Sequence, residues 1–177
     1  VEHVNTLKID DATLSILFAV AQEESATKSE NIKFGIHQRM REGKALLNHT
    51  RFLGYTKDAE GQLVIVPEEA EIVRKIFSLY LEGNGVRKIK RYLEEHGIRT
   101  VTGKSEWSTS TIDRMLSNEK YMGTLLLQKT YTPDFLTGKQ KKNRGELSMY
   151  MIEDAHEAIV EKGVFEAVQK KKHKRNY

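Results

Sequence analysis

The chain has 177 residues, of which 38% are hydrophobic and 31% are charged, and its formal net charge is +4. This length accommodates one domain, or one domain with an appendage. The absence of cysteine excludes a disulfide framework, thiolate zinc ligands and thiol catalysis. No signal-peptide pattern opens the sequence, and no apolar run approaches the ~18 residues of a membrane span. Because the first residue is Val1 rather than methionine, we expect a piece of a longer protein.

Charge is distributed unevenly along the sequence. Residues 1–31 contain two basic and six acidic side chains, whereas the remainder contains 27 basic and 19 acidic ones. A basic body behind an acidic first segment favours a polyanionic partner such as nucleic acid. A soluble protein with a mildly basic surface has the same balance, so charge alone leaves both interpretations open.

Residues 10–42 have the pattern of one long helix. Asp10 suits the N-cap, and Asp11 suits the first turn, where negative charge is favoured by the helix dipole. Apolar residues recur at helical spacing near both ends, while residues 22–31 are almost wholly polar. This pattern is typical of a bridge between two bodies. Two shorter helices broken near Gly35 are the alternative.

A hairpin and three helices are expected next. Turn residues at 58–61 precede a strand-like run at 63–66. Helical spacing then predicts a helix that Pro67 opens, followed by helices over residues 86–96 and 108–117. In the last of these, Ser108 stands at the N-cap, and Trp107 and Ile112 stand at the positions of a hydrophobic staple.

The C-terminal third combines strands with one helix. Residues 121–127 and 148–152 are strand-like and predict a β-hairpin whose long tip is the basic segment 139–145. A last helix is expected over residues 162–172, and the chain ends in a basic run. The predicted fold class is therefore α+β and mainly helical, with a long N-terminal helix, a helix-turn-helix-like domain, a small antiparallel hairpin and a C-terminal helix.

The sequence offers no catalytic or cofactor motif. The six histidines show no metal-ligand spacing, and no glycine-rich phosphate loop precedes a helix. Glu23 and Glu24 are neighbours on a helix and point about 100° apart, so they belong to a solvated face. We expect neither a metal ion nor a cofactor.

The strongest functional signal is for nucleic acid. Residues 86–96 followed by 108–117 are similar to a helix-turn-helix with an enlarged turn. Short hydroxyl side chains near the start of the second helix suit phosphate and base-edge contacts, and Arg114 can donate two hydrogen bonds to guanine. An ordinary capped helix with a polar face is the competing interpretation. The basic tip and tail would neutralise phosphates, or are solvated segments.

Four segments together resemble the large serine recombinases, which are the serine integrases and transposon recombinases. In chain order they are residues 11–36 (DATLSILFAVAQEESATKSENIKFGI), 67–83 (PEEAEIVRKIFSLYLEG), 107–123 (WSTSTIDRMLSNEKYMG) and 156–160 (HEAIV).

The resemblance implies a division of the chain. Residues 1–44 would be the tail of a catalytic domain and the long linking helix, and residues 45–177 the recombinase (DNA-binding) domain. The family's nucleophilic serine and arginine motifs match no position here, so this chain alone is expected not to be catalytic. Ser25 and Asn31 stand where many small relatives have arginine, which argues against a direct catalytic or DNA-binding role for that turn of helix.

The resemblance also implies a function. The parent protein would cut and rejoin DNA through a 5′-phosphoserine intermediate to move a mobile element, in the bacterial cytoplasm and without a cofactor. This chain would bind one attachment-site or transposon-end half-site in double-stranded DNA. It would contact other subunits of a dimer or tetramer through Leu14, Leu17, Phe18 and Ala21.

The expected DNA contacts come from the second half of the long helix, an extended arm at 48–51 suited to a minor groove, the helix-turn-helix and the basic tip. These residues are Lys33, Arg39, Arg41, Lys44, His49, Arg51, Lys104, Ser108, Ser110, Thr111, Asp113, Arg114, Lys139, Lys141, Lys142 and Arg144.

Two other classes of function remain open from the sequence. The same helix-turn-helix would serve a regulator that never cuts DNA, and an upstream catalytic domain in the parent would exclude that class. The polar long helix would serve a protein-interaction module with a coiled-coil arm. RNA binding is disfavoured, because no aromatic-bearing sheet motif for base stacking is present.

Overall fold

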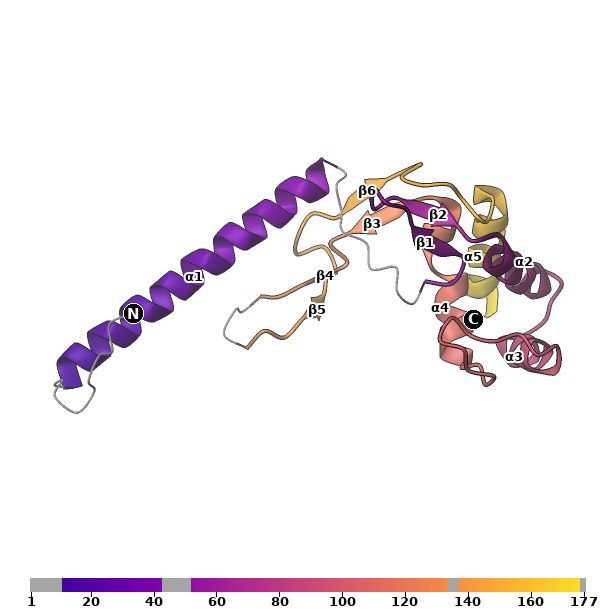
Figure 1. Cartoon of the computed structure of the whole chain (residues 1–177), viewed down its shortest axis with the longest axis horizontal. Coiled ribbons are helices and arrows are strands. Elements are labelled where there is room, and N and C mark those ends of the chain that lie inside the picture. The colour runs from indigo at the N-terminus through magenta and orange to yellow at the C-terminus, as the bar shows by residue number, and fades with distance from the viewer. Residues whose placement is uncertain (1–10, 43–51, 134–136, 176–177) are drawn as a thin grey trace. The chain divides into compact units, whose positions relative to one another are not determined.

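The computed structural model describes residues 11–42, 52–133 and 137–175 (Figure 1). The chain divides into two compact units, Val1–Ala45 with Gln128–Ser148 and Leu46–Leu127 with Met149–Tyr177. The fold is α+β and mainly helical, as the sequence predicts. The expected domain boundary between residues 44 and 45 lies outside the described residues and stays a prediction.

The first unit contains the long helix α1 (Asp11–Arg41). It is continuous through Gly35, so the alternative of two shorter helices is wrong. At ~1.5 Å per residue it is about 46 Å long. Apolar side chains along it are exposed, with Phe18 72% and Phe34 68% accessible. No helix in the described ranges is both long and apolar enough to cross a membrane.

The first unit also contains a small antiparallel pair, β4 (Thr130–Tyr131) and β5 (Lys141–Lys142). The expected basic tip over residues 139–145 is therefore partly wrong, because Lys141 and Lys142 lie in a strand. Two-residue strands carry no readable periodicity, so the sequence pattern did not reveal them.

The second unit holds the remaining elements, most of which follow the predicted order. They are β1 (Tyr55–Lys57), β2 (Leu63–Ile65), α2 (Pro67–Leu81), α3 (Val86–Glu95), α4 (Thr109–Leu116), the 3-10 helix η2 (Glu119–Met122), β3 (Leu125–Leu127), β6 (Tyr150–Ile152) and α5 (Lys162–Arg175).

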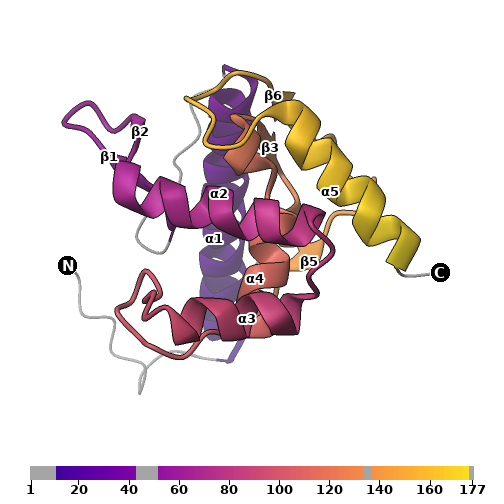
Figure 2. The same cartoon turned by 90° about the vertical axis from the view of Figure 1, so that its right-hand side faces the viewer.

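The core of the second unit forms where the helices meet. Helix α2 buries Val73, Ile76, Phe77 and Tyr80, which recur every three or four residues and so share one face. Helix α4 contacts α2, α3 and α5 (Figure 2). Because α4 is held on three sides, its remaining outer face has a fixed orientation within the unit.

Two small antiparallel ladders complete the second unit. Strand β1 pairs with β2 as the sequence predicts, with Tyr55 opposite Ile65. Strand β3 pairs with β6, with Leu125 opposite Ile152, which confirms the predicted pairing of these segments.

The expectation of a strand over residues 121–127 is wrong for its first half. Residues 119–122 form η2, and Gly123 ends this turn with φ +79°. A β-carbon built on Gly123 would lie 2.8 Å from the backbone oxygen of His156. The close approach of the segment around His156 therefore requires glycine here, and the strand begins only at Leu125.

Candidate nucleic-acid interface

Helices α3 and α4 are joined through Trp107. Its side chain is 2% exposed, and its Nε1 donates to the carbonyl oxygen of Ile98 at 2.8 Å. Its backbone N–H donates to Glu94 Oε1, also at 2.8 Å. The residue that precedes α4 is thereby bound to the end of α3 and to the loop that follows it. The predicted pairing of two helices across an enlarged turn is thus present.

The loop between these helices contains a tight turn at residues 100–104. Gly103 N–H donates to the Thr100 carbonyl at 2.8 Å, and Thr100 N–H donates to the Lys104 carbonyl at 2.9 Å. The Lys104 N–H also donates to Thr100 Oγ1 at 3.1 Å. Arg99 donates to the Gly103 carbonyl at 3.0 Å. These bonds give the turn a defined shape, and Lys104 is exposed on it.

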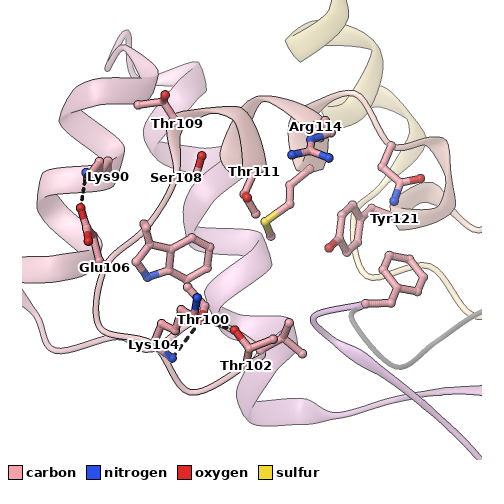
Figure 3. Close-up of a pocket in the computed structure, with 15 residues that line it drawn as sticks. Lys90, Thr100, Thr102, Lys104, Glu106, Ser108, Thr109, Thr111, Arg114 and Tyr121 are labelled. Atoms are coloured by element: carbon pink, nitrogen blue, oxygen red, sulfur yellow. Dashed lines mark hydrogen bonds and ion pairs between the residues drawn. The ribbon is translucent and has the colours of Figure 1, made fainter.

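A surface hollow of about 810 Å³ lies between this turn and α4. In Figure 3, Thr100, Thr102 and Lys104 border it on one side, and Thr111 and Arg114 of α4 border it on another. Hydroxyl groups and cations predominate among the labelled residues. Groups of these two kinds contact phosphates and base edges in protein–DNA interfaces. The hollow is therefore suited to a partner that is anionic and accepts hydrogen bonds.

The outer face of α4 carries the predicted polar residues. Ser108 stands at the N-cap position, but its Oγ lies 2.7 Å from Ser110 Oγ and makes no capping bond to the backbone. Arg114 is exposed, and its Nε donates to the Ser110 carbonyl at 3.2 Å. The guanidinium thus lies back along α4, where its Nη2 also donates to Ser110 Oγ at 3.4 Å. A guanidinium has five N–H donors, so these two contacts leave others for a partner. Thr111 is half-buried.

Asp113 differs from the other predicted contacts on α4. Its Oδ1 accepts a bond of 2.6 Å from Lys172 Nζ on α5, although its side chain is 54% exposed. The basic C-terminal run, expected to be a solvated tail or a phosphate contact, is instead part of α5 as far as Arg175. Its Lys172 is directed into the unit.

The basic residues of the hairpin are all exposed, and one buried amide shapes their loop. Asn143 is 4% exposed; its Nδ2 donates to the carbonyls of Gln128 and Leu147 at 2.9 and 2.7 Å. Its Oδ1 accepts from the N–H groups of Gly145 and Leu147 at 3.0 and 3.2 Å. All four hydrogen-bonding positions of the amide are used. The exposed cations are Lys139, Lys141, Lys142 and Arg144.

The two strand lysines do not form a single basic face. Lys141 and Lys142 are consecutive residues of β5, so their side chains point to opposite faces of the pair. Arg144 follows Asn143, and its backbone N–H donates to Glu146 Oε2 at 2.5 Å. That bond lowers the pKa of Glu146, so an anion lies beside the basic cluster.

Helix α1 carries the remaining predicted residues that can be placed. Arg39 is exposed, with its Nε 3.2 Å from the Gly35 carbonyl, and Lys33 is half-buried. Arg41 is the last residue of the helix. Among the predicted oligomerisation residues, Leu17, Phe18 and Ala21 are exposed, and Leu14 is half-buried. Lys44, His49 and Arg51 lie outside the described residues.

The structure thus brings together one group of the predicted residues in the second unit: Lys104, Ser108, Ser110, Thr111 and Arg114 lie on α4 or the turn before it. Sequence reasoning missed Lys90, Thr100 and Thr102, which line the same hollow. Lys90 lies 3.6 Å from Glu94 and 3.7 Å from Glu106. The i, i+4 spacing of Lys90 and Glu94 on one helix was the signal in the sequence that could have predicted the first of these ion pairs.

Two buried tyrosines, Tyr55 and Tyr121, are titratable groups of the core. Tyr55 Oη donates to the Glu157 carbonyl at 2.7 Å and accepts from Ile159 N–H at 3.2 Å. Burial raises the pKa of Tyr55 to about 12 and raises the pKa of Tyr121 as well, so both phenols stay protonated. Within the described ranges, no three His, Asp or Glu side chains are placed to hold a metal ion.

The arrangement of α2 to α5 coincides with a known sequence family. The sequence model of the Recombinase family matches residues 67–175, which is more than half of the chain and runs from the start of α2 to the end of α5. The chain belongs to the recombinase family. The resemblance to large serine recombinases drawn from the four motifs is thereby confirmed.

Curated relatives of this recombinase chain are much longer. A Bacillus subtilis (strain 168) protein described as "Putative DNA recombinase" is 27% identical over 132 residues, covering 71% of this chain and 26% of the relative. The Escherichia coli (strain K12) uncharacterized protein YbcK is 29% identical over 111 residues, covering 58% of this chain and 21% of the relative. The chain spans about a quarter of the length of these relatives.

Two solved structures share the fold of this recombinase chain. A crystal structure of an LSR–DNA complex matches with a TM-score of 0.58 and 18% identity, over 82% of this chain and 40% of that one. A structure from work on the sequence requirements of the Listeria innocua prophage attP site matches with a TM-score of 0.53 and 19% identity, over 81% and 51%. At such identities the likeness establishes the fold.

Proposed function

We propose that this chain is the sequence-reading DNA-binding part of a site-specific serine recombinase and that it binds one half of an attachment or transposon-end site. The observation that carries the proposal is the exposed face of α4. Ser110 and Arg114 are accessible on a helix that is packed against α2, α3 and α5. A helix held in this way, with short hydroxyls and an arginine outward, suits insertion into a major groove.

Family membership and the neighbouring structures support the same function. The solved structures with this fold include an LSR–DNA complex and one concerning a prophage attP site. The basic side chains around the hairpin and in the second half of α1 would contact backbone phosphates, which position a protein without reading sequence. The segment 48–51 would follow an adjacent minor groove, where arginine is favoured.

The chemistry of cutting and rejoining DNA would come from a catalytic domain of the parent protein. A serine of the catalytic domain would attack a DNA phosphodiester, break its bond to the 3′ oxygen and release a 3′-hydroxyl end. The 5′-phosphoserine bond that forms would conserve the energy of the phosphodiester, as in other covalent catalysis by a nucleophile. The exposed apolar side chains of α1, among them Leu17 and Phe18, would contact other recombinase subunits. Residues 1–44 and 45–177 would then be the linking helix and the DNA-binding domain.

The test is fluorescence anisotropy on a half-site duplex of about 25 base pairs from the end of the host element, with a scrambled duplex as control. Arg114→Ala should weaken binding to the true site by about 1–3 kcal/mol and relax sequence preference. Arg87→Ala removes an exposed arginine of α3 and should leave that preference unchanged. Measurements at two or more salt concentrations separate phosphate contacts from base contacts.

Each outcome distinguishes between functions. If Arg114→Ala weakens binding to both duplexes equally, Arg114 is a phosphate contact. Equal binding of the unmodified chain to both duplexes would move sequence specificity to other parts of the parent protein. An absence of binding at every salt concentration would favour the protein-interaction module, for which the exposed apolar residues of α1 offer a surface.

A further inference from the structure

The basic end of α5 is divided between solvent and the protein interior. Lys172 lies on the face of α5 that buries Phe165 and Val168, because positions 165, 168 and 172 share one side of a helix. Its side chain is only 16% exposed. Lys170 and Lys174, by contrast, are exposed. Lys172 is therefore placed for a contact within the protein.

All three donor hydrogens of Lys172 have an acceptor on α4 or at its C-cap. Nζ lies 2.6 Å from Asp113 Oδ1, 3.1 Å from the Asp113 carbonyl oxygen and 2.5 Å from Ser117 Oγ. Ser117 Oγ donates in turn to the Asp113 carbonyl at 3.0 Å. An ammonium group has three donors and no acceptor, so this set uses its full capacity.

Neighbouring side chains of α5 bind helix ends in the same way. Gln169 Nε2 donates to the carbonyl of Leu116, the last residue of α4, at 2.6 Å. Lys171 Nζ donates to the carbonyl of Leu81, the last residue of α2, at 2.6 Å. Helix C-terminal carbonyls have no partner within the helix, and cations there are favoured by the dipole. Helix α5 thus supplies hydrogen-bond donors to the C-terminal carbonyls of both α4 and α2.

We propose that Lys172 is a positioning residue for sequence reading by α4. Its contacts fix the C-terminal turn of α4, and its charge neutralises Asp113, the acidic group on the outer face of that helix. Asp113 is then a structural partner rather than an acceptor for a cytosine amino group. This inference rests on the proposed function, because it concerns how α4 is presented to DNA.

The competing role for Lys172 is a phosphate contact. Its low exposure and its three occupied donors argue against that role, whereas Lys174 is free of both constraints on the same helix. The two roles differ in what they change. A lost phosphate contact weakens binding to every sequence and lowers the salt dependence, with a log–log slope smaller by about 0.9. A displaced α4 changes the ratio between the true and scrambled duplexes.

The experiment measures the affinity of the 177-residue chain for both duplexes across a salt series, with Lys172→Met, Asp113→Asn and the control Lys174→Met. We expect Lys172→Met and Asp113→Asn each to reduce the ratio of affinities for the true and scrambled duplexes by about fivefold, which lies within the range of coupling between contacting residues. The salt slope should stay unchanged. Lys174→Met should leave the ratio unchanged. The double variant Asp113→Asn/Lys172→Met should be no worse than either single variant.

A measurement without DNA separates this inference from the proposed function. The melting temperatures of the same variants form a double-mutant cycle, and non-additive losses would show that the two residues act together. Additive losses of melting temperature would overturn the positioning role alone. The same conclusion would follow if the unmodified chain prefers the true duplex and Lys172→Met keeps the same ratio of affinities. An unmodified chain that does not prefer the true site would overturn the proposed function itself. Asp113→Asn covers the case in which Lys172→Met does not fold.

Discussion

Single side chains in the second unit carry contacts that join distant segments, and His156 is one of them. Its Nε2 lies 2.7 Å from the carbonyl oxygen of Lys120, so Nε2 carries the proton and donates. Its Nδ1 is buried without a hydrogen-bond partner among the described residues, and its ring packs edge-on against Tyr55 with centroids 5.1 Å apart. Burial lowers the pKa of His156, which keeps the ring neutral.

This lowered pKa predicts a loss of stability in acid. Because the unfolded chain binds the proton of His156 at a higher pH than the folded chain, the folded state is favoured fully above the unfolded pKa of about 6.5. That contribution is lost as the pH falls through this value towards the lower folded pKa. Urea denaturation at pH 7.5 and pH 5 should therefore show a smaller pH dependence for His156→Gln than for the unmodified chain.

The control for this measurement is His96→Gln. His96 is the exposed C-cap residue of α3, where it stacks on Tyr92, and it lacks the buried setting of His156. An identical pH dependence in His156→Gln and the unmodified chain would show that His156 does not contribute to acid sensitivity.

At the scale of elements, the start of β3 depends on glycine. Gly123 and Gly61 have almost the same φ, +79° and +80°, in the left-handed region. A β-carbon on Gly61 would meet nothing within 4 Å, whereas one on Gly123 would clash with the backbone of residue 156. Gly61→Ala should cost about 1 kcal/mol of stability through backbone strain alone, and Gly123→Ala clearly more than this. Thermal denaturation of both variants checks the difference, and equal losses would contradict it.

The hairpin loop depends on Asn143 in a different way. Asn143→Ala removes four hydrogen bonds from one buried amide and should release the loop at residues 143–147. The measurement is amide hydrogen exchange, in which Gly145 and Leu147 should lose protection while the amides of α2 keep theirs. Asn143→Asp is the matched comparison, because it keeps the acceptor oxygen and removes the two donors. Unchanged protection at Leu147 in Asn143→Ala would contradict this account.

Elements with a repeating pattern could be predicted from the sequence, and those formed by single contacts could not. Helices α2, α3 and α4 follow from apolar spacing and from Pro67 and the terminal glycines. The 3-10 turn is capped locally by Asn118 and Gly123, but the close approach of the segment around His156, more than 30 residues away, has no local signal. The pair β4–β5 likewise depends on the bonds of Asn143 to Gln128 and Leu147.

At the scale of the whole molecule, the binding of DNA should depend strongly on salt. If Lys139, Lys141, Lys142 and Arg144 contact phosphates as proposed, replacing each by alanine should reduce the log–log salt slope by about 0.9 per contact. The quadruple variant should then lose up to about 3.6 from that slope while keeping its preference for the true site. Anisotropy titrations from 50 to 300 mM salt check this, with Lys88→Ala on α3 as a control for a single charge.

The candidate site could be predicted in composition but not in detail. Sequence spacing placed Ser110 and Arg114 outward on one helix, and the structure agrees. It could not show that Lys90 and Thr100 line the same hollow as Arg114, because the fold of the intervening loop brings these residues together. Lys172 falls in both the predicted last helix and the basic run, and its spacing from Phe165 and Val168 indicates the buried side of α5. Its contact with Asp113 could not be predicted, because the two residues are 59 positions apart.

The contact between α5 and α4 has a consequence for how this sequence can diverge. Asp113 and Lys172 are 59 positions apart in the chain and form one ion pair. A relative that loses the acid at the position of Asp113 gains nothing from a lysine at the position of Lys172, so the two positions should change together. Lineages in which both positions differ would then stabilise α4 through other contacts. A chimera that takes position 113 from one lineage and position 172 from another should be less stable than either parent.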